Sequence, residues 1–169
     1  MKKCPRFFVS VVLLILCASA NAQALWQNTT LGMSEQAIKE AYPEARRPAN
    51  PGTLAEGLKE ALCVEGYKLS NNLFRISFYT KEDKLVQVAL DCTNEKTFGA
   101  QGVIFDSLTE ALRSKYGNEL SKMRDSDVRK SVWMSGRTNI TLFLMAIDRK
   151  ESVLRIIYQV RLAAEGDKL

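Results

Sequence analysis

The sequence predicts an α+β fold of two similar units, each a helix followed by an antiparallel meander, with the helices packed on one face of the sheet. Apolar residues recur first with the helical period and then with the alternating period of strands, and this succession occurs twice. Short turns separate the expected strands, which favours antiparallel pairing because parallel strands need long crossovers. Ala37–Tyr42 and Ala111–Tyr116 share the pattern A-[I/L]-[K/R]-x-x-Y. We therefore expect a tandem repeat with half-units at about 31–92 and 98–162; chance similarity between two amphipathic helices is the alternative.

The first 22 residues have the layout of a secretory signal peptide. Basic residues open the chain, an apolar run follows over 7–17, and small residues at 18–22 contain two overlapping A-x-A cleavage patterns. The apolar run is shorter than the roughly 20 residues that span a bilayer. We expect cleavage after Ala22, which leaves 23–169 as a single exported domain in the bacterial periplasm.

The formal charge of +5 overstates how basic the exported part is. Three of the 24 basic residues, and none of the 19 acidic ones, lie in the signal peptide. The remainder is close to neutral, so charge gives no reason to expect a nucleic-acid partner or a membrane surface. No other segment is long and apolar enough to cross a membrane. We expect no membrane attachment after signal cleavage.

Two helices are expected before the first meander. Ser34 is a good N-cap residue and Glu35 places negative charge in the first turn, so a helix should begin there and end at Pro43. Thr53 should cap a second, short helix with one apolar stripe. That stripe comprises Leu54, Leu58, Ala61 and Leu62.

Three strands should follow, over 67–69, 73–80 and 85–91. The turns that separate them, at Ser70–Asn72 and Lys81–Lys84, are rich in residues that favour turns. In the third strand apolar and polar residues alternate, which is the pattern of a strand with one buried face. This unit is therefore expected to be a three-stranded meander.

The second unit should repeat this order. A helix is expected over 105–116, ending at Gly117, since glycine is the preferred residue just after a helix. The polar stretch after it has the composition of a loop. Three strands should then follow, over 128–134, 138–147 and 153–162.

Cys63 and Cys92 are the two cysteines of the exported part, an even number in an oxidising compartment. We expect them to form a disulfide. By the chain-entropy estimate, closing this loop would stabilise the fold by about 3–4 kcal/mol. Two free and inert thiols are the alternative.

Several catalytic chemistries are absent from the sequence. The chain has no histidine, which removes serine and cysteine nucleophile systems that depend on it, and also the commonest zinc ligand. Phosphate-binding glycine motifs are also absent. Carboxylate pairs at 82–83 and 125–127 lie in polar turns beside basic residues, which indicates solvated surface charge. We expect no enzymatic activity, no cofactor and no metal site.

One face of the predicted sheet carries residue types that are enriched at protein interfaces. Strand side chains alternate between faces, so the face opposite the apolar one should present aromatic residues, methionine and arginine. The candidate protein-binding face comprises Arg75, Tyr79, Trp133, Phe143, Met145, Arg155 and Arg161. The alternative is that its aromatic residues form a second small core or a homodimer contact.

The stretch Leu31-Gly32-Met33-Ser34-x-x-x-Ile38 is similar to the glycine-containing helix entry of BamE-type outer-membrane assembly factors. The layout of two helix-plus-meander units resembles the tandem-repeat architecture of the beta-lactamase inhibitor protein. The resemblance covers most of the exported part in layout but only the helix entry in sequence. It implies a protein-binding role, and it carries over no site residue.

We therefore expect a non-enzymatic periplasmic protein-binding module of the inhibitor, immunity or envelope-assembly type, whose partner is another envelope or secreted protein. The alternative is a small-ligand carrier with an apolar pocket between the helices and the sheet. A carrier should contain a cavity of about 300 Å³ or more. A protein binder should instead have a filled core and an exposed aromatic face. Whether the two meanders join into one sheet is left open by the sequence.

Overall fold

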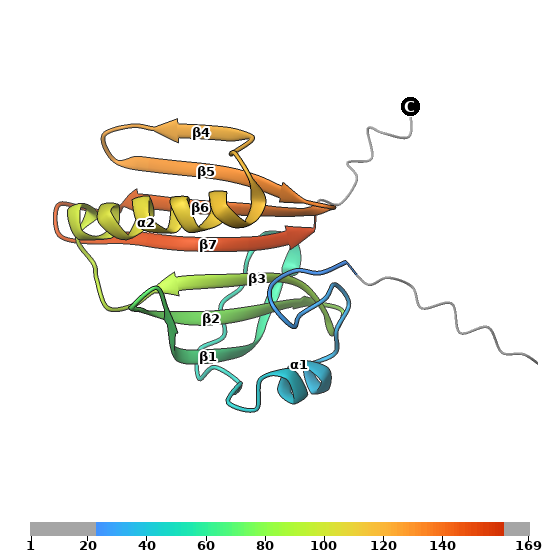
Figure 1. Ribbon diagram of the computed structural model, residues 1–169. Coiled ribbons are helices and arrows are strands. Elements are labelled where there is room, and N and C mark those ends of the chain that lie inside the picture. Colours follow the sequence, from blue (N-terminus) through green and yellow to red (C-terminus); the bar gives the residue numbers. More distant parts are fainter. Residues whose placement is uncertain (1–22, 161–169) are drawn as a thin grey trace, which may run out of the picture.

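The computed structural model describes residues 23–160, which form one seven-stranded antiparallel sheet with two α-helices. The strands are β1 (Lys59–Leu69), β2 (Asn72–Lys81), β3 (Lys84–Cys92), β4 (Ser121–Arg124), β5 (Val128–Ser135), β6 (Thr138–Ala146) and β7 (Ser152–Val160). Their order across the sheet is β1-β2-β3-β7-β6-β5-β4 (Figure 1). The predicted mixed fold with an antiparallel sheet is confirmed, and the two meanders form one continuous sheet through β3 and β7. The expected signal peptide, at 1–22, lies outside the described residues.

Helix α1 (Glu35–Ala41) begins and ends as predicted. The Ser34 hydroxyl accepts a hydrogen bond from the Ala37 backbone N–H at 3.3 Å, which satisfies one of the free donors at the helix start. Ile38 is fully buried. The Tyr42 ring continues this contact, since it stacks on Trp26 and lies 5.4 Å from the ring of Phe78 in β2. This end of the chain is thus fixed against β1–β3.

Helix α2 (Phe98–Tyr116) ends at Gly117 as predicted but begins at Phe98 rather than at Phe105. Gly117 has a φ of 83°, a left-handed conformation that glycine adopts without strain. The early start is explained by Thr97, whose hydroxyl accepts a hydrogen bond from the Ala100 N–H at 3.4 Å. The predicted apolar stripe lies against β5, β6 and β7. Its members Phe105, Leu108 and Leu112 are buried, and Tyr116 is partly buried.

The predicted helix from Thr53 is wrong. A short 3₁₀ turn, η1 (Ala55–Gly57), occupies this place, and β1 begins soon after it. Glu56 and Gly57 have φ values of 61° and 74°, which end any α-helix. Leu62 faces the core from a strand instead, because a four-residue spacing of apolar side chains fits either period.

Strand β4 was also missed, because all four of its side chains are exposed and supply no apolar alternation.

One hydrophobic core lies between the sheet and the helices. We call this side of the sheet the helix face; α2 contacts β5, β6 and β7 there, and in Figure 1 it lies in front of β6 and β7. The core is continuous across the junction of the two meanders. Its largest fully buried side chains include Trp133, Phe74, Phe78, Ile38 and Leu62.

Trp133 was predicted on the binding face, and this assignment is wrong. Its side chain is fully buried on the helix face, opposite Ile140 of β6. The indole N–H donates a hydrogen bond at 3.0 Å to the carbonyl of Gly117, at the end of α2. The sequence pattern of β5 is weakly apolar, so its faces were assigned one residue out of register, and such a shift exchanges the two faces of a strand.

Replacing Trp133 by alanine should therefore test folding and not binding. We expect Trp133→Ala to lower the free energy of unfolding by about 3–5 kcal/mol, because it opens a cavity and frees the Gly117 carbonyl. Met134→Ala, one residue along and 38% exposed, should change stability by less than about 1 kcal/mol. Denaturant unfolding of both variants measures the difference; equal losses would contradict the placement of Trp133.

Cys63 and Cys92 are free thiols, so the predicted disulfide is not formed. Cys63 lies opposite Ser77, whereas Cys92 lies opposite Phe74. Ser77 and Phe74 are an odd number of positions apart on β2, so their side chains point to opposite faces of the sheet. Cys63 therefore lies on the face of Ser77, and Cys92 lies on the face of Phe74. A disulfide requires the two Cβ atoms to lie about 4 Å apart, which is impossible across a sheet.

Both thiols should therefore react with an alkylating agent. In the folded protein Cys92, which is partly exposed, should react first, although burial raises the pKa of its thiol and slows the reaction. Cys63, at 1% exposure, should react only after unfolding. Mass spectrometry of protein from an oxidising compartment, alkylated without reductant, measures this; absence of alkylation after denaturation would show a disulfide and a different register.

Candidate functional site

The face of the sheet away from the helices carries three cross-strand rows of side chains. The first row is Arg75, Asp91, Arg155, Phe143 and Lys130. The second row is Ser77, Ala89, Ile157, Thr141 and Val132. The third row is Tyr79, Gln87, Gln159, Asn139 and Met134. A largely apolar row therefore lies between a charged row and a row rich in side-chain amides.

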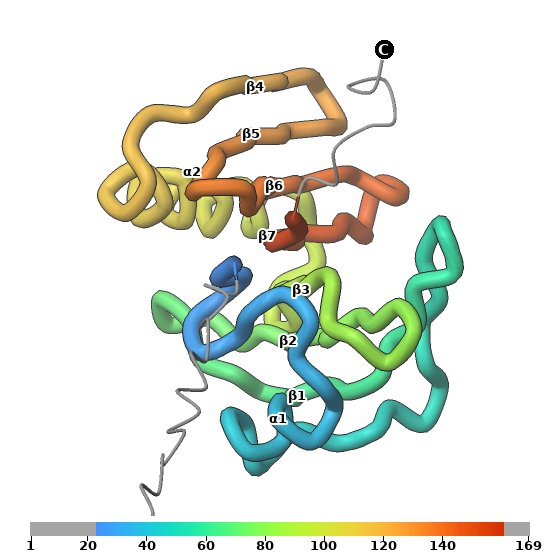
Figure 2. The backbone as a smooth tube through the Cα atoms, turned by 90° about the vertical axis from the view of Figure 1, so that its right-hand side faces the viewer, coloured from blue at the N-terminus to red at the C-terminus, as the bar shows by residue number. Residues whose placement is uncertain are grey.

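Half of this face is covered by the chain itself. Leu54 and Leu58, on either side of η1, pack against Tyr79 and Ala89. Figure 2 shows the segment leading into β1 on the side of the sheet opposite α2. Tyr79, predicted to bind a partner, is only 5% exposed and thus belongs to this second small cluster.

The other half of the face, over β5–β7, has neither helix beside it, and we call it the open face. Phe143, Ile157 and Val132 are half-buried there, and Met145 is 39% exposed. The register places Phe143 and Met145 on the same face as Arg155, as the sequence predicted. Arg161 lies outside the described residues. The structure thus brings together three of the predicted side chains on an uncovered apolar surface.

The two predicted arginines of this face are already paired within the protein. Arg155 is ion-paired with Asp91 on the neighbouring strand. Burial alone would lower the pKa of Arg155, but the hydrogen bond and charge of Asp91 outweigh it and raise the pKa. Arg75 contacts Glu60 at 2.7 Å and Glu65 at 2.9 Å. These arginines therefore border the apolar row without being free to pair with a partner's carboxylate.

Glu60 is a buried carboxylate, yet its contacts are structural. One oxygen accepts the Gly52 backbone N–H at 3.0 Å, and the other lies 2.7 Å from the Arg75 guanidinium. This arrangement ties the segment before β1 to the sheet. Within 23–160 no group of three acidic or cysteine side chains is placed to hold a metal ion, and no helix of that range is long and apolar enough to span a membrane.

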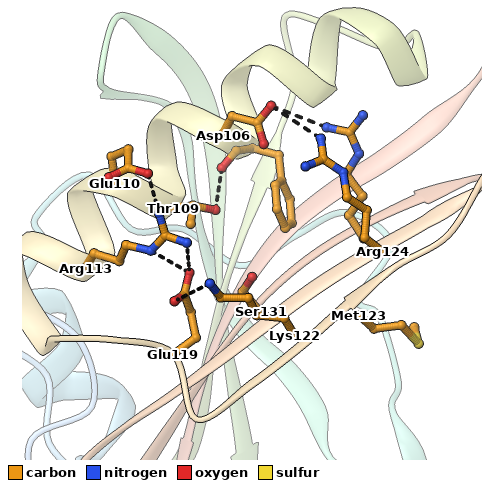
Figure 3. A pocket seen from close by; sticks show the side chains of 11 residues that line it. Asp106, Thr109, Glu110, Arg113, Glu119, Lys122, Met123, Arg124 and Ser131 are labelled. Atoms are coloured by element: carbon orange, nitrogen blue, oxygen red, sulfur yellow. Dashed lines mark hydrogen bonds and ion pairs between the residues drawn. The ribbon is translucent and has the colours of Figure 1, made fainter.

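A second feature is a hollow of about 320 Å³ between α2 and the β4–β5 hairpin, which we call the charged groove (Figure 3). Glu119 lies at its base with a side chain only 1% exposed. Arg113 contacts this carboxylate at 2.7 Å and Lys122 at 3.1 Å. Burial raises the pKa of Glu119, but hydrogen bonds from Arg113, its own backbone N–H and Lys122 outweigh it and lower the pKa to about 2.

Sequence reasoning missed this groove. Its residues come from α2, from the stretch that was expected to be a loop, and from β5, whose two faces were assigned the wrong way round. The one available signal was charge spacing, since Glu119 and Lys122 are three residues apart. Because charged side chains line the hollow, it does not fit the apolar pocket expected of a small-ligand carrier.

Glu119 should make stability depend on acid pH. Its pKa is about 2 in the folded protein against an ordinary value of 4.5, so the stabilisation is complete above about pH 5 and is lost as pH falls toward 2. As pH falls over this range, the free energy of unfolding should decrease in both proteins. The decrease should be about 1–2 kcal/mol smaller in Glu119→Gln than in the unmodified protein. Thermal unfolding across the pH range measures this, with Glu44→Gln as control because Glu44 is exposed and lies outside these ion pairs; parallel curves would contradict the ion pairs.

Comparisons with known proteins give little further information. No protein-family model matches the chain, and no curated protein sequence matches it. Among solved structures the chain is similar to a DUF4309 family protein (YjgB) from Bacillus subtilis, with 15% sequence identity and a TM-score of 0.41. The match covers 82% of this chain and 84% of that one. A likeness at this level carries no functional argument, so the site is interpreted from its own residues.

Proposed function

We propose that this protein is an exported, non-enzymatic protein-binding module of the bacterial periplasm, and that the open face binds its partner, another envelope or secreted protein. The observation that carries the proposal is the uncovered apolar surface formed by Val132, Phe143, Met145 and Ile157. An apolar centre with a polar surround is the arrangement of protein interfaces. The signal-peptide pattern of the sequence supports export.

The surroundings of this surface also favour a protein partner. On one side Arg155 and Asp91 satisfy each other, so their burial in an interface leaves no unpaired charge. On the other side Gln159 and Asn139 present amide groups, which can both donate and accept hydrogen bonds.

We further propose that the fold is a tandem repeat of two helix-plus-meander units. β3 and β7, the last strands of the two units, pair antiparallel at the centre of the sheet, and each unit continues outward in the same order. Ile38 and Leu112 hold equivalent places in the shared helical pattern, and both are buried. β4 is an addition in the second unit.

A photo-cross-linkable residue at Thr141 tests the open face. Introduced there, in the protein expressed in its native periplasm, it should give one discrete cross-linked product with another protein, since Thr141 lies at the centre of the apolar surface. The same residue at Ser107, exposed on α2, should not give that product.

The product should disappear when Phe143→Lys is added, because a charge would be buried in the interface, and should persist with Val103→Lys on α2. Thermal unfolding shows whether each variant is folded. Equal products from Thr141 and Ser107, or no product from either, would refute the proposal, and a product with twice the chain mass would make the open face a homodimer contact instead.

A further inference from the structure

The two edge strands of the sheet, β1 and β4, differ in whether their outer backbone groups are paired. The outer edge of β1 is paired with the preceding segment: Arg46 and Cys63 exchange two backbone hydrogen bonds of 2.9 and 2.8 Å, and the Glu60 N–H donates to the Gly52 carbonyl at 2.9 Å. β1 also contains two register shifts. At the other edge, β4 pairs with β5 and with no other segment of 23–160. Within 23–160 the outer edge of β1 is therefore covered up to Cys63, whereas the outer edge of β4 is uncovered.

The backbone groups that β4 leaves unpaired can be assigned. The Asp125 N–H donates to the Val128 carbonyl at 2.7 Å, so Asp125 turns toward β5. In an antiparallel pair alternate residues turn their N–H and C=O groups toward the partner strand, which places Met123 and Ser121 inward as well. Lys122 and Arg124 then direct their backbone groups outward. Such a row of unpaired groups is the surface on which an added strand forms.

The side chains of β4 determine which kind of strand can pair with this edge. Lys122 and Arg124 point to the helix face, since they lie opposite Ser131 and Arg129, and both border the charged groove. Positive charge on an edge strand disfavours pairing with uncharged or basic strands, and it therefore favours acidic ones.

Two of the arginines in the groove are incompletely paired. Arg124 and Arg129 share the single carboxylate of Asp106, at 3.9 and 3.5 Å, and Figure 3 shows Arg124 directed at it. A well-formed ion pair between nitrogen and oxygen is about 2.7–2.9 Å long. Asp106 is itself 58% exposed, so the mouth of the groove holds positive charge that an incoming carboxylate could neutralise.

An apolar side chain accompanies this edge on its other side. Met123, opposite Lys130, is 50% exposed on that side. A strand added beside β4 would place alternate side chains against Met123 and into the groove. The added strand should therefore carry apolar side chains on one face and acidic side chains on the other.

We propose that β4 binds an extended segment of another protein as an additional antiparallel or parallel strand, with acidic side chains facing Arg124 and Arg129 and apolar ones facing Met123. This site lies at the edge of the sheet beside the open face, since Met123 continues the row of Phe143 and Lys130, but it does not depend on the partner of that face. The chemistry that recognises the segment is its backbone together with alternating carboxylates.

The probe is an end-blocked peptide in which valine and glutamate alternate, added to the purified exported chain. NMR titration should shift the backbone amides of β4 and slow hydrogen exchange at Lys122 and Arg124, while β1 is unaffected. A peptide in which lysine replaces glutamate should bind at least about tenfold more weakly, a difference of 1.4 kcal/mol. A peptide N-methylated at alternate residues should lose binding, because it cannot donate to the edge.

Two protein variants separate charge from backbone. Arg124→Gln keeps the outward N–H and should weaken binding about tenfold or less. Arg124→Pro also removes that N–H and should abolish binding, yet it breaks no bond to β5, and thermal unfolding verifies its fold. Phe143→Lys should bind the peptide normally. Equal binding of the lysine or the N-methylated peptide, unchanged binding by Arg124→Pro, shifts on the open face, or no binding of the glutamate peptide would each overturn the proposal.

Discussion

The pairing of β3 with β7 is the interaction on which the rest of the structure depends. Five residue pairs, from Gln87–Gln159 to Asp91–Arg155, join two meanders that are far apart in sequence. Val88 faces Tyr158 and Leu90 faces Ile156 on the helix face, and all four are buried. A unit of about 60 residues buries a smaller fraction of its surface than the whole domain does, so each unit alone would be marginally stable. Joining them gives a single core and fixes which side chains share a face.

Coverage of the sheet follows from this pairing. α2 covers the helix face over β5–β7, while the segment with η1 covers the other face over β2 and β3. The opposite face over β5–β7 is thus left with an apolar row between two polar ones. The charged groove arises separately, because α2 packs on β5–β7 and stops short of β4.

The sequence predicted those elements whose signals are local. Ser34 and Pro43 defined α1, Gly117 defined the end of α2, and the strands β2, β3 and β5–β7 lie near their expected positions. β1 was expected over 67–69 but begins at Lys59. The errors came from features that depend on partners distant in sequence. Leu58 and Leu62 have a spacing that fits a helix, yet Leu62 lies in β1, paired with Phe78 of β2, and Leu58 lies before the strand in the second small cluster.

The candidate site was predicted in part, for a related reason. Phe143, Met145 and Arg155 share a face because the apolar alternation of β6 and β7 is strong. β5 alternates weakly, and only its register with Ile140 shows that Trp133 is in the core. Burial of Tyr79 depends on a loop, and the opposite faces of Cys63 and Cys92 depend on a count across three strands. No short sequence window contains this information.

The central position of the β3–β7 pair has a consequence for the order of folding. Because β7 is the last of the described strands, the first meander keeps the inner edge of β3 unpaired until α2 and β4–β6 have been added to the chain. Contacts between segments so far apart in sequence form slowly, since the loop between them must be closed first. When the chain emerges from its N-terminus, the inner edge of β3 would remain unpaired and prone to aggregation until nearly the whole domain is available. The fold is therefore completed by its C-terminal strand, and a chain truncated before β7 would present two open edges at what should be the middle of its sheet.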